Sequence, residues 1–198
     1  MDSPIDCIWI SNSGFDYAKG VYDDEYGPLV LCEADLEKAP VRSAKHTREV
    51  RFYKPDFFCI KDTLVALDDL PHTYELRFHL DTLKMEQTAQ GAWISDFQKE
   101  WDIFILPLYP GELTCKLLSG VDTPPMGGWF VGRNDLTLHK STTLTMTVSG
   151  KKDFTFATLL IPVRRGSEMP QTEKRSANLF ALRMNTREYL IDLENLSK

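Results

Sequence analysis

Apolar and polar side chains alternate strictly in the stretch TYELRFHL, residues 73–80. In an extended strand, successive side chains point to opposite faces of a sheet, so Glu75, Arg77 and His79 share one face and the apolar residues share the other. This period of two residues runs through most of the chain, whereas the helical period of 3.6 is nearly absent. The pattern predicts strands at residues 5–10, 15–22, 29–32, 47–53, 57–61, 73–80, 83–87, 92–96, 102–106, 113–118, 129–131, 136–148, 153–163, 179–184 and 189–193.

Turn-forming residues separate the expected strands, for example at KPD (54–56), YPG (109–111), GG (127–128) and SG (149–150). Only residues 35–39 have the pattern of a helical turn, and the polar stretch 166–177 is expected to be a mobile loop. Many short strands without helices predict an all-β fold, a two-layer antiparallel β-sandwich of about 13–15 strands. Because no linker or repeat divides the chain, we expect residues 1–198 to form a single domain.

The pattern also predicts two hairpins. The first joins residues 47–53 to 57–61 across KPD, with Pro55 at the first central position of the turn. The second joins TTLTMTV to DFTFATLLIPV across SGKK. Within TTLTMTV, we expect Thr143, Thr145 and Thr147 to face solvent, because an antiparallel sheet commonly has one wet face.

The composition is that of an ordinary globular protein, with 42% hydrophobic and 26% charged residues. The net charge of −6 argues against a nucleic-acid partner, since phosphate binding needs a basic face. It leaves room for an anionic sugar polymer, because a local basic groove can lie on an acidic protein. No apolar run approaches the ~20 residues of a membrane span, and the N-terminus lacks the pattern of a signal peptide.

No motif for a metal or a cofactor is present. The four cysteines and the histidines have no metal-ligand spacing, and phosphate-loop, calcium-loop, HExxH and GxSxG motifs do not occur. We therefore expect neither a metal nor a cofactor. Cys7, Cys59 and Cys115 lie in apolar runs, so we expect them to be small buried side chains.

Residues 44–81 combine several spaced elements. They are an H-x-R pair (His46 and Arg48), a K-P-x-aromatic turn (54–57), an apolar run that ends in Asp62, and an H-x-Y-E-x-x-x-H-L strand (72–80). In this order they resemble the C-terminal region of the heparinase II/III-like polysaccharide lyase family. The later segments DTPPMGGWF and FATLLIPV are similar to the Gly-Trp loop and the closing strand of that family.

The resemblance implies a large enzyme in which an N-terminal α/α toroid precedes a β-sandwich, with a cleft between them. Such enzymes cleave uronic-acid polysaccharides, such as alginate or the glycosaminoglycan heparan sulfate, by β-elimination. The reaction requires neutralisation of the uronate carboxylate, a base for the C5 proton and an acid for the leaving O4. The expected partners are thus an acidic polysaccharide and the toroid of the same longer protein, in the periplasm or outside the cell.

The catalytic residues of the family have no matching positions in this sequence. They are an Asn and a Tyr of the toroid and a His of an HGH-type segment, and in members with a metal the ligands come from the HGH-type, D-P-G and H-N-T segments. None of these three segments occurs here. We therefore expect the chain to be the C-terminal part of a larger protein, to begin downstream of those segments and to be inactive by itself.

Arg77, His79 and Trp129 are the candidate substrate-binding residues. Arg77 can pair with a sugar carboxylate or sulfate, and Trp129, beside two glycines, can stack on a sugar ring. Each also has a structural interpretation: the polar row as the wet face of a sheet, and Trp129 as a cap on the sandwich core. The alternative to a lyase domain is a non-catalytic carbohydrate-binding or structural β-sandwich, and a protein-interaction domain is a third interpretation.

Other polar and aromatic side chains are weaker candidates. His46 and Arg48 are as well explained by a buried hydrogen-bond network, His72 by a loop and His139 by a solvent-facing strand. The tyrosines at positions 17, 22 and 26 would suit a sugar surface, but the acidic residues at 23–25 would repel a polyuronate.

Overall fold

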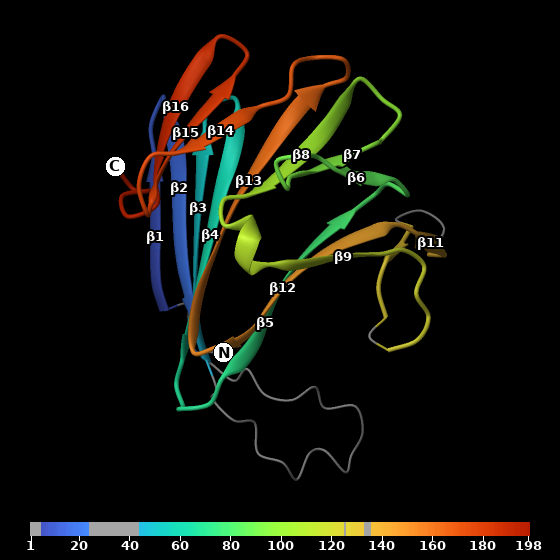
Figure 1. The fold of residues 1–198 in the computed structure, drawn as a ribbon, viewed down its shortest axis with the longest axis horizontal. Coiled ribbons are helices and arrows are strands. Elements are labelled where there is room, and N and C mark those ends of the chain that lie inside the picture. Colours follow the sequence, from blue (N-terminus) through green and yellow to red (C-terminus); the bar gives the residue numbers. More distant parts are fainter. Residues whose placement is uncertain (1–4, 24–43, 125, 133–135) are drawn as a thin grey trace.

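The computed structural model describes residues 5–23, 44–124, 126–132 and 136–198 (Figure 1). These residues contain sixteen strands and one short 3-10 helix, η2 (Pro110–Glu112). The strands are β1 (Ile5–Ser11), β2 (Phe15–Tyr22), β3 (Ala44–Tyr53), β4 (Phe57–Ala66), β5 (His72–Leu80), β6 (Met85–Gln87), β7 (Trp93–Ser95), β8 (Trp101–Pro107), β9 (Thr114–Leu118), β10 (Trp129–Val131), β11 (Leu138–Lys140), β12 (Thr142–Lys151), β13 (Asp153–Arg164), β14 (Gln171–Lys174), β15 (Leu179–Met184) and β16 (Arg187–Asp192).

Eight strands form one large antiparallel sheet in the order β1-β2-β3-β4-β13-β8-β7-β6. Strand β13 lies inside it, paired with β4 on one side and β8 on the other. Its alternate residues enter two different cores: Leu159 and Ile161 the first, Phe156 and Leu160 the second. This double burial explains why β13 reads as a continuous apolar run, because both of its faces must be apolar.

Two smaller antiparallel sheets lie on opposite sides of the large sheet (Figure 1). The C-terminal sheet, β14-β15-β16, brings Leu182 and Ile191 into the first core. The sheet β5-β12-β9, called the β12 sheet below, brings Leu144 and Met146 into the second core. The expected all-β antiparallel sandwich is confirmed, but the large sheet is covered on both faces, so the structure has three layers instead of the expected two. The single-domain organisation stays a prediction.

The first expected hairpin is confirmed, because β3 and β4 pair up to Tyr53 and Phe57. Its turn is closed by the N–H of Asp56, which donates to the carbonyl of Tyr53, so Pro55 occupies the second central position instead of the first. The second expected hairpin is wrong. Strand β12 pairs with β5 and β9, whereas β13 pairs with β4 and β8. Consecutive strands here pack face to face across the second core, which buries the apolar side of each.

Two further element boundaries differ from the expectation. The strand expected at 136–148 is divided into β11 and β12 at Ser141, whose N–H donates to the carbonyl of Gly128 at 2.8 Å. The polar stretch 166–177 contains β14, since pairing with β15 satisfies its backbone whatever its side chains are. The expected strand at 29–32 and the helical turn at 35–39 lie outside the described residues.

Two side chains are buried differently from the expectation. Cys59 is fully buried and Cys115 half-buried, but Cys7 is exposed because β1 is an edge strand of the large sheet. Tyr17 belongs to the first core and donates its hydroxyl hydrogen to Glu49 at 2.8 Å, so it does not form a sugar surface. Among the described residues, no helix has the length and apolar character needed to cross a membrane.

Candidate functional site

The outer face of the β12 sheet, which points away from the second core, carries the polar row of β5. In the register of this sheet, Thr145 of β12 lies between Arg77 of β5 and Lys116 of β9, and Thr143 lies between His79 and Leu118. Arg77, His79 and Lys116 are exposed. The face predicted for Arg77 and His79 is therefore the face on which the structure places them.

The threonines of β12 do not face solvent as expected. Thr143 is 1% exposed and Thr145 is 4% exposed, because β12 is the central strand and the longer side chains of β5 and β9 flank it on both sides. Ser141, at the start of this row, is 2% exposed. Among the described residues, the hydroxyls of Ser141 and Thr145 have no hydrogen-bond partner. A buried hydroxyl without a partner is costly, and both oxygens are closed to solvent.

A hydrogen-bond chain connects the polar row to the Gly-Trp loop. The N–H of Gly128 donates to Oγ1 of Thr143 at 3.1 Å, and the same oxygen lies 3.0 Å from Nδ1 of His79. The N–H groups of Ser141 and Gly120 both donate to the carbonyl of Gly128, at 2.8 and 3.0 Å. The loop is thereby fixed at the His79 end of the outer face.

Trp129 is the first residue of β10, which forms a two-stranded sheet with β11. Its Nε1 donates to the carbonyl of Val121 at 3.1 Å, and Nζ of Lys140 lies 5.9 Å from its ring centroid. The side chain is half-buried and lies outside both core clusters, so it does not cap the sandwich core. The structure thus brings Trp129 to the same end of the face as His79.

The described residues of the outer face include more cations than carboxylates, although the protein as a whole is acidic. Arg77 and Lys116 lie on this face and Lys140 lies beside Trp129, whereas Glu75 is the carboxylate of the face. Nε of Arg77 donates to Glu75, and the guanidinium has further N–H donors at its terminal nitrogens. The sequence analysis did not identify four residues of this site, which are Lys116, Lys140, Ser141 and Thr145. The alternation of threonines placed Thr145 on a polar face, but it did not show which strands flank β12.

The H-x-R pair forms a separate cluster on the large sheet. Asp62 is 2% exposed and accepts hydrogen bonds from Arg48 at 2.6 and 3.1 Å, and Nε2 of His46 lies 2.6 Å from the same carboxylate. Burial alone would raise the pKa of Asp62, but the hydrogen bonds with His46 and Arg48 outweigh it and hold the pKa below its usual value. This is the buried network that the structural interpretation of His46 and Arg48 expects.

The two remaining histidines also have local partners. His72 begins β5, with Nε2 2.8 Å from Oδ1 of Asp68, so it lies in a strand instead of a loop. His139 is half-buried and stacks on Phe130 with 5.2 Å between ring centroids. Within the described part of the chain, no group of three or more His, Cys, Asp and Glu side chains is placed to hold a metal ion. The described residues therefore offer no fit for the metal found in some members of the lyase family.

The fold is similar to that of solved lyase structures. A heparan sulfate lyase, HepC from Pedobacter heparinus, matches with a TM-score of 0.69 and 11% identity over 94% of this chain. The chain has the fold of a segment of heparinase III. A heparinase III gene product matches with a TM-score of 0.66 and 12% identity over 93% of this chain, and another heparinase III structure with 0.60 and 14% over 96%.

The resemblance noted in residues 44–81 is thus confirmed at the level of the fold. The chain spans about a quarter of the length of these structures, 27% for HepC and 26% for the other two. Neither the models of known protein families nor the curated protein sequences give a match to this sequence.

Gly128 should be the residue on which the geometry of the Gly-Trp loop depends. Its φ is +73°, and an added Cβ would lie 2.4 Å from Cα of Ser119 and 2.5 Å from the carbonyl of Leu118. Gly150 has the same φ of +73°, but an added Cβ there meets nothing within 4 Å. Both alanine variants carry the same backbone strain, of order 1 kcal/mol, and only Gly128→Ala adds a clash. In urea denaturation, Gly128→Ala should lower the free energy of unfolding clearly more than Gly150→Ala. Equal losses would show that the loop is not packed as described.

Proposed function

We propose that the chain is the C-terminal β-sandwich of a heparinase-type polysaccharide lyase, and that the outer face of its β12 sheet binds the acidic polysaccharide. The observation that carries the proposal is the juxtaposition of Arg77 and Lys116 across Thr145, a 4% exposed residue whose hydroxyl lacks a partner among the described residues. The heparinase III fold supports the lyase assignment.

The chemistry of the face suits a uronic-acid or sulfated polymer. Arg77 and Lys116 supply charge-assisted hydrogen bonds to a carboxylate or a sulfate. Thr145 lies buried between them in the register of the sheet and separates the two cations by the width of one strand. Thr143 holds His79 through Nδ1 at 3.0 Å, which fixes the orientation of the imidazole toward the polymer. These contacts bind and orient the polymer, and the acid–base pair of the elimination is assigned to other parts of the full-length protein.

The domain therefore acts as scaffold and cleft wall in this proposal. The residues that remove the C5 proton and protonate O4 come from the α/α toroid and from the segments upstream of this chain. The proposal includes that the full-length protein acts in the periplasm or outside the cell, where acidic polysaccharides are encountered. Because no described residues fit a metal, no step of the reaction is assigned to one.

The chain by itself should not cleave its polymer. We expect no rise in the ultraviolet absorbance of unsaturated uronate when the 198-residue chain is mixed with heparan sulfate, alginate or hyaluronan. The physical reason is that binding without a positioned base and acid leaves the barrier to β-elimination nearly unchanged. Appreciable turnover by the chain alone would contradict the assignment as a cleft wall.

Binding should depend on the two cations of the outer face. In isothermal titration with heparan sulfate oligosaccharides, Arg77→Gln and Lys116→Gln should each weaken the affinity about tenfold, since a hydrogen bond to a charged group contributes ~1.5–3 kcal/mol. The matched control is Arg164→Gln, which removes an exposed arginine paired with Glu100 at 3.0 Å and should change nothing. Affinity should also fall as salt is raised, because the pairs are solvent-accessible.

The same titration separates the alternative, a non-catalytic carbohydrate-binding module. The position of Trp129 outside both cores favours this reading, because its ring is not needed to close the sandwich. A stacking site predicts that Trp129→Ala abolishes binding, with little effect of salt or of Arg77→Gln. That result would replace the cation-based proposal, provided that circular dichroism shows the variant to be folded.

A further inference from the structure

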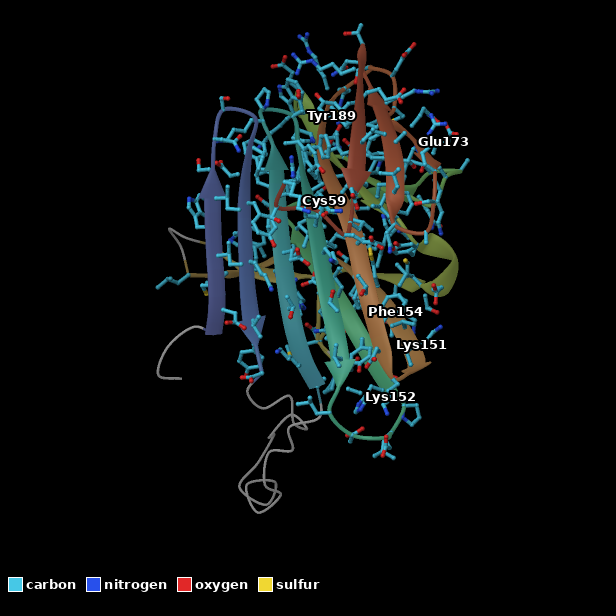
Figure 2. The ribbon with its side chains drawn as sticks, turned by 90° about the vertical axis from the view of Figure 1, so that its left-hand side faces the viewer. Cys59, Lys151, Lys152, Phe154, Glu173 and Tyr189 are labelled. Atoms are coloured by element: carbon cyan, nitrogen blue, oxygen red, sulfur yellow. The ribbon has the colours of Figure 1, made fainter. Side chains whose placement is uncertain are left out.

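A groove lies on the face of the large sheet that carries the C-terminal sheet. It has a volume of about 680 Å³ and is bordered by β4, β13, η2, the end of β12 at Lys151 and the C-terminal sheet. This volume is within the roughly 300–1,000 Å³ typical of ligand pockets. Figure 2 shows Phe154 and Lys151, two of its lining residues, beyond the end of the C-terminal sheet. The C-terminal sheet leaves this part of the large sheet open.

The floor of the groove is made of threonine hydroxyls. Thr63 of β4 and Thr155 of β13 are register partners, and their Oγ1 atoms lie 3.4 Å apart. Both side chains are half-buried. A hydroxyl can both donate and accept hydrogen bonds, so the floor is polar but carries no charge.

The walls of the groove carry equal numbers of both charges. Three lysines line it, Lys61, Lys151 and Lys174, together with three carboxylates, Glu112, Asp153 and Glu194. Several are held in place by partners. Lys151 pairs with Glu112 at 2.9 Å, Lys61 donates to the carbonyl of Leu193 at 2.8 Å, and Asn178 donates to Glu194 at 2.7 Å. Donors and acceptors are thus fixed side by side on a neutral lining.

Apolar surface is also present, supplied by Tyr109 and Leu193. The hydroxyl of Tyr109 donates to the carbonyl of Ala177 at 2.9 Å, and Nζ of Lys174 lies 5.2 Å from its ring centroid. The aromatic wall and the nearest donor are therefore fixed relative to one another.

We propose that this groove binds an uncharged, hydroxyl-rich ligand, a short neutral oligosaccharide. A polyanion would meet three carboxylates, and a cation would meet three lysines. A sugar hydroxyl both donates and accepts, which matches the paired lysines and carboxylates, and the apolar face of a sugar ring matches Tyr109. The site is separate from the outer face of the β12 sheet and holds whether or not that face binds an acidic polymer.

The test is saturation-transfer NMR of the 198-residue chain with three uncharged probes: cellotriose, maltotriose and N-acetylated chitotriose. At least one should give a saturable signal that is unchanged between 0.1 and 0.5 M salt, because no net charge is involved. Thr155→Trp should abolish the signal by filling the groove, and Lys174→Met, which keeps the fold and removes one donor, should weaken it several-fold. Arg77→Gln, on the opposite side, should leave it unchanged.

Three outcomes would overturn the proposal. They are the absence of a saturable signal with all three probes, a signal that survives both Thr155→Trp and Lys174→Met, and displacement of the neutral probe by a heparan sulfate oligosaccharide in the Arg77→Gln variant. The last result would show that the groove is an anion site. Because Lys174 is exposed, its variant remains informative even where Thr155→Trp fails to fold.

Discussion

Strand β13 has apolar side chains on both of its faces, and the rest of the structure depends on burying both. Its two hydrogen-bonding edges are satisfied by β4 and β8, which places it inside the large sheet. Each face then needs its own cover. The C-terminal sheet supplies one through Leu182 and Ile191, and the β12 sheet supplies the other through Leu144 and Met146. Three layers result from the double-sided pattern of one strand.

This arrangement determines which surfaces are left for binding. The β12 sheet has three strands, and its central strand, β12, has a neighbour on each side. The outer face of this sheet is polar. Thr143 and Thr145 of that face are buried by the longer side chains of β5 and β9, while the cations Arg77 and Lys116 remain exposed. On the other side, the C-terminal sheet covers only part of the large sheet and leaves the neutral groove open. The same sandwich thus presents one face with two exposed cations and one groove whose lining has no net charge.

The sequence predicted local features well and non-local ones poorly. Alternation in TYELRFHL places Arg77 and His79 on one face, and the turn residues locate the β3–β4 hairpin, because each depends on a few adjacent residues. The pairing of β12 with β5 and β9 joins strands that are distant in sequence, and no local pattern specifies it. For this reason the second hairpin and the solvent exposure of Thr143 and Thr145 were predicted wrongly. The position of Lys116 beside Thr145 could not be derived. Strand β14 was missed because its polar side chains carry no hydrophobic period.

The central claim, that the outer face of the β12 sheet binds an acidic polysaccharide, is tested most directly by a two-dimensional amide NMR titration of the isotope-labelled chain with a heparan sulfate tetrasaccharide. The account predicts saturable shift changes that concentrate at the amides of Arg77, Gly128, Ser141 and Thr145, with those of the groove on the far side unmoved. The claim would be contradicted if the chemical shifts of these four amides stayed constant while others changed, or if no shift changed in a saturable way.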